Sequence, residues 1–234
     1  MVAIASMRVT CDTLTVRHSM GHCLIMVDST KVPGGIFALA QEADPESTAA
    51  RALDAAQACM ARFGVAKTTI DDIAREANLS RATLYRHYAN KHEMFGAVAQ
   101  REILRIAEAV NASIASDGTL IDAVTNAIVT TARRLNENPA LAFVLVHEPE
   151  ALVPFLAFDA AAIALRHAAA FGAVAFEPWL DPVAAERAGE LIARIVLAYL
   201  SPQEISILTD PETVRDLAST FLVPGLMQLH NVTR

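Results

Sequence analysis

The sequence has 234 residues, of which 53% are hydrophobic, 6% aromatic and 19% charged, and its mean hydropathy is +0.34. A low charge content combined with high hydropathy excludes a chain that is mainly disordered. The hydrophobic residues are chiefly alanine, leucine, valine and isoleucine, and there are only nine glycines. This composition predicts an all-α fold, because alanine and leucine are strong helix formers.

The sequence also indicates where in the cell the protein is expected. No stretch reaches the roughly 18 uninterrupted apolar residues that a spanning helix needs. Charged residues interrupt the first 40 positions, and no basic segment followed by an apolar one indicates a signal peptide. The three cysteines, Cys11, Cys23 and Cys59, are an odd number without the spacing of a disulfide framework. We therefore expect a cytoplasmic protein with reduced thiols and no membrane partner.

The net charge of −7 is unevenly distributed. Residues 45–105 carry nine Lys and Arg against seven Asp and Glu, whereas residues 106–234 carry seven against fifteen. A weakly basic segment thus precedes an acidic one. Such asymmetry between parts of a chain is typical of a protein in which one part binds a polyanion.

Residues 1–44 show no sustained hydrophobic period and contain Pro33-Gly34-Gly35, so we expect a flexible amino-terminal arm. His18, His22 and Cys23 could bind a metal, since the two histidines have helical i, i+4 spacing. A metal site needs three or four ligands and supporting hydrogen bonds, so incidental side chains on an arm are the simpler interpretation. We predict no metal and no cofactor.

A helical pattern starts at Ser47. Apolar residues recur at three- and four-residue steps up to Phe63, and Gly64 is expected to end this first helix. Three further helices are indicated by capping residues. Thr69, with Asp72 three residues later, starts the second helix, Ser80 starts the third, and Asn90 starts the fourth.

Two short helices joined by the turn 78–80 form a helix–turn–helix. Its apolar residues are expected to pack the third helix against the first: Ile70, Ile73, Ala74, Leu79, Leu84 and Tyr88. The opposite face of the third helix, with Arg81, Ala82, Thr83, Tyr85 and Arg86, would then be available to the DNA major groove. A helical hairpin with no role in DNA binding could show the same pattern.

The residues of this region resemble the amino-terminal domain of the tetracycline-repressor (TetR) family. The resemblance covers residues 49–100, and its elements occur in the family's order and spacing: Ala55-Ala56, Arg62-Phe63-Gly64, Thr68-Thr69-Ile70-Asp71-Asp72-Ile73-Ala74, Ala77-Asn78-Leu79-Ser80, Thr83-Leu84-Tyr85-Arg86-His87-Tyr88 and Lys91. Three positions depart from the family pattern. Met60 replaces a usual Phe, Asn78 a usual Gly, and Ala82 a frequent Gly or Pro. Asn tolerates left-handed geometry, and Met is an apolar filler, so the fold is still expected.

The resemblance implies a set of DNA-binding residues: Thr68, Thr69, Ser80, Arg81, Ala82, Thr83, Tyr85, Arg86, His87 and Lys91. Thr68, Thr69 and Lys91 would meet phosphates. Tyr85 and His87 would contact backbone or sugar, and Arg81 and Thr83 would reach base edges. Two alternatives stay open: Arg81 as a phosphate contact only, and His87 as a packing residue against the fourth helix.

The carboxy-terminal part is expected to consist of helices in succession, at 119–136, 140–147, 155–175, 182–200 and from 211 onward. The last two long helices have wide apolar faces. In the TetR family such a pair docks on its twin, so the resemblance implies a homodimer with the interface residues Leu191, Ile195, Tyr199, Leu217 and Phe221. The alternative is a helix pair buried inside one chain.

Residues 143–176 combine phenylalanines with many alanines and few polar groups. Small side chains facing large ones can leave an apolar cavity, so we expect a hydrophobic effector such as a fatty acid or another lipid-like molecule. The predicted ligand-binding residues are Phe143, His147, Phe155, Phe158 and Arg166. An ordinary alanine-packed core would show the same composition.

Enzyme signatures are missing from the sequence. It contains no Gly-x-Ser-x-Gly, His-Glu-x-x-His, Cys-x-x-Cys or P-loop motif, and no catalytic residue is predicted. We expect three parts: the arm 1–44, a helix–turn–helix DNA-binding domain 45–95, and a helical ligand-binding and dimerisation domain 96–234. The expected function is a dimeric, cytoplasmic transcriptional regulator, most simply a repressor released from a palindromic operator by its effector. The competing class is a helical bundle that binds small molecules or lipids and no longer uses its helix–turn–helix on specific DNA.

Overall fold

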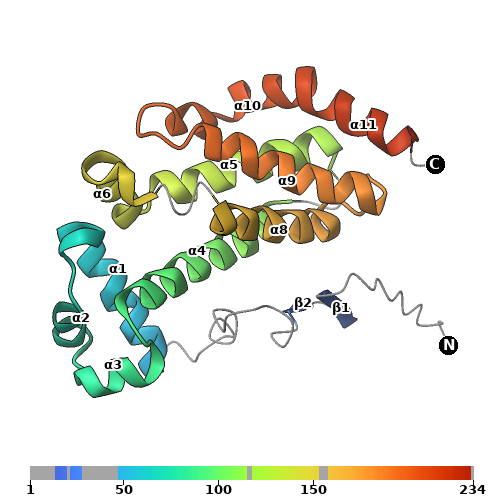
Figure 1. Cartoon of the computed structure of the whole chain (residues 1–234). Helices are drawn as coiled ribbons and strands as arrows, with labels where there is room; N and C mark the ends of the chain where they lie inside the picture. The colour runs from blue at the N-terminus through green and yellow to red at the C-terminus, as the bar shows by residue number, and fades with distance from the viewer. Residues whose placement is uncertain (1–13, 20–21, 28–46, 115–117, 153–157, 233–234) are drawn as a thin grey trace.

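The computed structural model describes residues 14–19, 22–27, 47–114, 118–152 and 158–232. Four helices form its amino-terminal part: α1 (Thr48–Lys67), α2 (Ile70–Ala77), α3 (Arg81–His87) and α4 (Lys91–Ser113). A larger helical part follows: α5 (Leu120–Asn136), α6 (Pro139–His147), α8 (Phe158–Ala175), α9 (Pro182–Ala198), α10 (Pro211–Leu217) and α11 (Val223–Val232). The predicted all-α class, with a small helix–turn–helix unit joined to a larger helical domain, is confirmed (Figure 1).

Short elements complete the described chain. Two 3₁₀ turns span Pro149–Leu152 and Ile205–Thr209, and a π-helical turn at Ala218–Leu222 joins α10 to α11. A hairpin of two antiparallel strands, β1 (Leu14–Ser19) and β2 (His22–Val27), was not predicted. β2 has five consecutive apolar residues after His22, and such a run without alternation does not distinguish a strand from a helix.

We call α1 to α3 with the first half of α4 the amino-terminal unit. It has its own apolar core, in which Ile73, Leu84, Tyr88 and Met94 are almost completely buried. Burying each such side chain stabilises the fold by about 1.5–3 kcal/mol. Ile70 and Leu79 pack against this core from its edge, so the predicted helix–turn–helix core is confirmed.

Local capping explains where these helices begin. The hydroxyl of Thr69 accepts from the Asp72 backbone N–H, and the Asp72 carboxylate accepts from the Thr69 N–H, which closes a capping box. Ser80 and Asn90 cap α3 and α4 in the same position. The three predicted caps are confirmed, and each stabilises its helix by about 1 kcal/mol.

We call α5 to α11 the helical body. Its core gathers aliphatic residues from α5, α9, α10 and the turns around them, among them Val124, Ile128, Val196 and Val214. α4 runs from the amino-terminal unit into this body and packs along α5 (Figure 1). α4 is therefore the long element shared by both parts.

The helices α8 and α9 cross at two glycines. A Cβ on Gly172 would lie 2.5 Å from the Ala185 carbonyl oxygen, and one on Gly189 would overlap the Ala168 carbonyl oxygen. Only glycine permits the two backbones to come this close. Among the described residues, no helix combines the length and the apolar composition that crossing a bilayer would require.

Candidate nucleic-acid interface

The exposed face of α3 is the strongest candidate for contact with DNA. Ser80, Arg81, Ala82, Tyr85 and Arg86 are exposed there, and Thr83 and His87 are half-buried. Tyr85 is 54% exposed and Tyr88 is 1% exposed, so one tyrosine faces out and the other completes the core, as the sequence predicts. Burial raises the pKa of the Tyr88 phenol, which keeps that side chain neutral.

The position of α3 is fixed by the turn before it. Asn78 adopts the left-handed conformation, with φ 52° and ψ 50°, and its backbone N–H bonds the Arg75 carbonyl at 3.2 Å. Arg51 on α1 donates from Nη2 to the Ala77 carbonyl oxygen at 2.7 Å. The end of α2 is thus held by its own turn and by a side chain from another helix.

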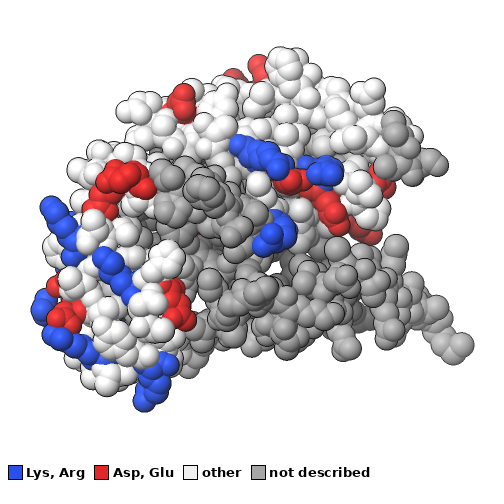
Figure 2. All heavy atoms as spheres, viewed as in Figure 1, with Lys and Arg blue, Asp and Glu red and all other residues white. Residues whose placement is uncertain are grey.

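Two exposed ion pairs link these helices: Arg62 of α1 to Glu76 of α2, and Arg81 of α3 to Asp71 of α2. Exposed pairs of this kind contribute little to stability. Arg81 can therefore exchange Asp71 for a phosphate or a base edge at small cost. Basic side chains are spread over the end of the molecule that α1 to α3 form, interleaved with acidic ones (Figure 2).

Two of the side chains predicted to contact DNA, Thr68 and Lys91, bond to the protein's own backbone. Thr68 is 0% exposed, and its hydroxyl donates to the Gly64 carbonyl oxygen at 2.5 Å. Lys91 donates from Nζ to the carbonyl oxygens of Val65, Ala66 and Thr68 at 2.9–3.1 Å. Both side chains hold residues 65–69, the last turn of α1 and its link to α2, which we call the loop before α2. Thr69 at the end of this loop is exposed.

Sequence analysis missed Arg51 and Glu148, which position this unit. Glu148, just after α6, accepts hydrogen bonds from the backbone N–H groups of Val65 and Ala66. The Arg51 contact joins residues 26 positions apart, and the Glu148 contacts join residues more than 80 positions apart. No local pattern marks them, because helical periods and caps connect residues only up to four positions apart.

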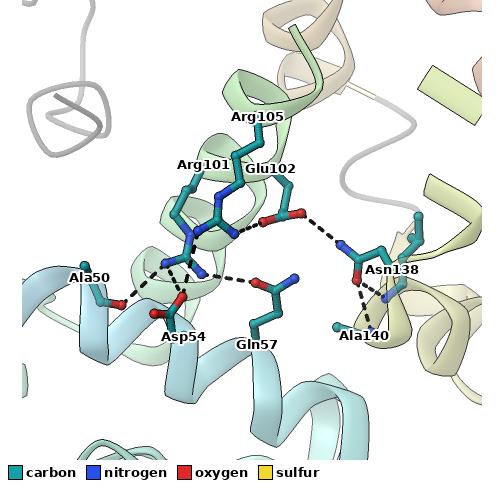
Figure 3. A network of polar contacts seen from close by, with 9 residues as sticks. Ala50, Asp54, Gln57, Arg101, Glu102, Arg105, Asn138 and Ala140 are labelled. Atoms are coloured by element: carbon teal, nitrogen blue, oxygen red, sulfur yellow. Dashed lines mark hydrogen bonds and ion pairs between the residues drawn. The ribbon is translucent and has the colours of Figure 1, made fainter. Parts of the chain in front are cut away.

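A second polar cluster lies where α1, α4 and α6 meet (Figure 3). Arg101 pairs with Asp54 at 2.7 Å and donates to the Gln57 side-chain oxygen at 3.1 Å. Glu102 accepts from Arg105 at 2.8 Å and from the Asn138 amide at 3.1 Å. Burial and the neighbouring Arg105 lower the pKa of Arg101, and its pairing with Asp54 opposes this effect.

A separate apolar cavity of about 270 Å³ lies in the body between α4, α5, α8 and α9. Its lining is mainly aliphatic and aromatic, including Ile103, Ile106, Phe171, Ile192 and Val196. The polar residues among the described lining are Glu108, Asn111 and Thr131. Such a cavity suits an apolar molecule.

The predicted ligand residues lie mostly outside this described lining. Phe143 and His147 stack on each other on α6, where the Phe143 ring packs against Gly64 of α1. Arg166 is exposed. Phe155 lies outside the described residues, and Phe158 begins α8 with its side chain likewise outside them.

The predicted dimer residues divide into two groups. Leu191 and Phe221 are exposed, and Phe221 is 71% exposed on the π-helical turn. Ile195, Tyr199 and Leu217 are partly buried against the core of the body. Met227 and Leu229 on α11 are further exposed apolar side chains, which sequence analysis did not name.

Residues 52–98 match the family model described as bacterial regulatory proteins, tetR family. The amino-terminal unit is therefore similar to proteins of the TetR family. The matched residues extend from α1 into the first half of α4 and include the whole of α2 and α3.

Two curated relatives share this region. The HTH-type transcriptional repressor SCO4008 of Streptomyces coelicolor is 43% identical over 67 residues, which are 29% of this chain and 35% of the relative. The uncharacterized HTH-type transcriptional regulator MT1294 of Mycobacterium tuberculosis is 34% identical over 97 residues, 42% of this chain and 48% of the relative. The chain thus spans between about a third and a half of the length of these relatives.

The fold similarity extends further than the sequence similarity. The crystal structure of the TetR family repressor AlkX from Dietzia sp. strain DQ12-45-1b, implicated in biodegradation of n-alkanes, has a TM-score of 0.62 and 23% identity. The similarity covers 80% of this chain and 98% of that one. The helical body therefore has a TetR-like fold as well.

Proposed function

We propose that this protein is a transcriptional regulator, most simply a repressor, that binds a two-fold symmetric operator through α3. The observation that carries this proposal is the exposed face of α3, with Arg81, Tyr85 and Arg86, on a helix whose other face is locked into a core by Leu84. A helix fixed in this way can enter the major groove without losing its internal packing. Residues such as Thr69 and Arg86 would bind phosphate and set register, while Arg81 and Thr83 would read bases.

A second copy of the chain is part of this function. The exposed Leu191 and Phe221, with Met227 and Leu229, offer an apolar surface on α9, the π-helical turn and α11. Pairing two copies by this surface would present two α3 helices to half-sites about 34 Å apart. The two-fold symmetry of the dimer would then match a palindromic operator.

The cavity supports a hydrophobic, lipid-like effector. Glu108 is the one ionisable residue among the described lining residues, and it carries a negative charge when ionised. An uncharged head group, as in an acyl ester, suits this lining better than a free fatty-acid carboxylate, which Glu108 would repel. An effector here would contact α4 at Ile103 and Ile106, so its binding would change the tilt of the helix that follows α3.

The test starts from DNA selected by the protein. Purified full-length protein is used to select duplexes from a random pool, and the enriched duplex is titrated at two salt concentrations against an unrelated competitor. We expect a palindromic consensus and binding that survives the competitor and weakens steeply with salt. No enrichment, or binding no better than the competitor, would contradict the proposal and favour a ligand-carrying helical bundle.

A further inference from the structure

The helix α1 is kinked near its end, at Gly64. Gly64 has a φ of 78° and a ψ of 177°, which are not helical, so residues 65–67 form a separate last turn. A Cβ on Gly64 would lie 2.6 Å from the Glu148 carboxylate carbon and 2.7 Å from Cε1 of Phe143. Glycine is needed here twice, for the conformation and for the close approach of two side chains from the helical body.

The Glu148 carboxylate binds the backbone just beyond this glycine. Its Oε2 accepts from the Val65 N–H at 2.7 Å and from the Ala66 N–H at 3.1 Å. Two successive N–H groups that point at one anion form a backbone nest, a concave site that favours negative charge. Because Glu148 is only 9% exposed, these charge-assisted bonds replace the water that its carboxylate has lost.

A cation lies on the carbonyl side of the same turn. The Val65–Ala66 peptide contacts both charges, because its N–H donates to Glu148 and its carbonyl oxygen accepts from Lys91. Lys91, the first residue of α4, donates from Nζ to the carbonyl oxygens of Val65, Ala66 and Thr68. The loop is therefore held between an anion on its N–H side and a cation on its carbonyl side. It ends at Thr69, the residue that starts the helix–turn–helix.

The other end of α6 is anchored to α4. Asn138 caps α6 by accepting from the Ala140 and Leu141 N–H groups, and its side-chain amide donates to Glu102 (Figure 3). Glu102 is followed by Ile103, which lines the apolar cavity. The nine-residue helix α6 thus connects a cavity-lining stretch of α4 to the loop before α2.

We propose that Glu148 is a positioning residue for DNA binding: seated in the nest of Val65 and Ala66, it sets where α2 begins relative to the helical body. Displacement of α4 at the cavity would reach the same loop through Asn138, α6 and Glu148. This inference rests on the proposed DNA-binding function. It assigns to the body a direct hold on the DNA-binding unit in addition to their connection through α4.

The test compares Glu148→Ala and Glu148→Gln with the matched variants Glu150→Ala and Glu150→Gln in the full-length protein. Glu150 is an exposed carboxylate two residues away. The first measurement is amide hydrogen exchange at Val65 and Ala66 without DNA. The second is the Kd for the selected duplex, well below the unfolding temperature of each variant, so that a purely structural role would leave it unchanged.

We expect Glu148→Ala to speed exchange at both amides and to weaken DNA binding about tenfold, because the two charge-assisted hydrogen bonds that position the start of α2 are lost. Glu148→Gln should fall between Glu148→Ala and wild type, and both Glu150 variants should match wild type. Glu148→Gln keeps the size of the side chain and one acceptor oxygen, so it decides the question if Glu148→Ala does not fold.

Each contrary result has a separate meaning. Faster exchange with a wild-type Kd would show that the contact only packs the two parts together, which overturns the positioning role. Unchanged exchange would show that the nest does not hold the carboxylate. If the wild-type protein selects no duplex, the proposed function fails on its own, and the positioning role for DNA fails with it, while the exchange measurement still decides whether the nest forms.

Discussion

The amino-terminal unit and the helical body are built by different means. In the amino-terminal unit, α2, α3 and α4 each begin at a capping residue whose side chain accepts a hydrogen bond from the backbone N–H three residues later. The core of the unit lies directly beneath these helices. The body depends on distant contacts, such as the glycine crossing of α8 and α9 and the packing of the Ile205–Thr209 turn on α5. Helices of the body are also capped, at Thr119, Asn138, Asp181 and Asp210, so the two parts differ in how their helices are held together and not in how the helices begin.

The same contrast appears in the comparisons. Sequence identity to SCO4008 extends over 67 residues, whereas the fold similarity to AlkX covers 80% of the chain at 23% identity. A surface that must fit the uniform shape of DNA tolerates little change. A cavity can be relined by many apolar side chains of similar volume while its helices keep their places. If the proposed function holds, the body is the part in which the specificity for an effector would reside.

The largest expected effect comes from separating the two copies of the proposed dimer. Phe221→Glu places a charge on the most exposed apolar side chain of the proposed dimer surface. We expect monomers in analytical ultracentrifugation and a loss of operator affinity of about 100-fold or more, because the second half-site no longer binds intramolecularly. Ile207→Glu alters another exposed apolar residue, in the turn between α9 and α10, and should leave a dimer. If the Phe221→Glu protein is still a dimer, the interface lies on another surface of the molecule.

The next effect tests the amino-terminal unit alone. Tyr85→Ala removes an exposed side chain from α3 and should weaken operator binding about tenfold, the effect of one lost DNA contact. The circular dichroism spectrum and the dimer mass should match wild type, since Tyr85 lies outside the core. Loss of helical signal instead of affinity would make Tyr85 a packing residue.

What could be predicted from the sequence follows the same division. The caps Thr69, Ser80 and Asn90, and the split between Tyr85 and Tyr88, could be predicted because they depend on spacings of three to four residues. Thr68 and Lys91 were assigned to DNA by resemblance alone. Their side chains bond the loop before α2, and that loop's path depends on Gly64 and Glu148.

The cavity was harder to predict from the sequence. Composition indicated a cavity among residues 143–176, and part of its lining, such as Phe171 and Gly172, does come from that stretch. Its other walls come from α4, α5 and α9, which only the tertiary fold brings together. Phe143 and His147 lie instead at the contact between α6 and α1, because α6 turns towards the amino-terminal unit.

Glycine-to-alanine substitutions, one in each part, compare the stability of the two parts directly. Gly189→Ala forces a methyl group into the Ala168 backbone and should destabilise the protein by about 1–3 kcal/mol. Gly96→Ala in α4 meets nothing within 4 Å and should stabilise it by about 0.5–1 kcal/mol through helix propensity. Thermal unfolding measures both. Equal effects at the two positions would show that the close crossing of α8 and α9 is not formed.

Filling the cavity should separate ligand binding from DNA binding. Ala193→Leu adds apolar volume to the lining on α9, and we expect the affinity for a long-chain acyl ester to fall about tenfold, since the enlarged side chain crowds the ligand. Operator affinity without ligand should stay at the wild-type value. Ala112→Leu, at an exposed position on α4, is the control. Unchanged ester binding in Ala193→Leu, measured by calorimetry, would place the ligand outside this cavity.

The smallest effect concerns pH and one contact inside the body. Asp122 on α5 accepts from the Thr119 hydroxyl and pairs with Arg215 of α10, and these contacts lower the pKa of its carboxyl to about 2. An unfolded aspartate has a pKa of about 3.9, so this contribution to stability is complete above about pH 4 and disappears as the pH falls towards 2. Asp122→Asn should remove that part of the acid dependence, while Asp216→Asn, an exposed neighbour of Arg215, should keep it. Denaturant unfolding between pH 2 and pH 5 gives the comparison, and identical pH profiles for wild type and Asp122→Asn would mean that α10 is held to α5 by its apolar contacts alone.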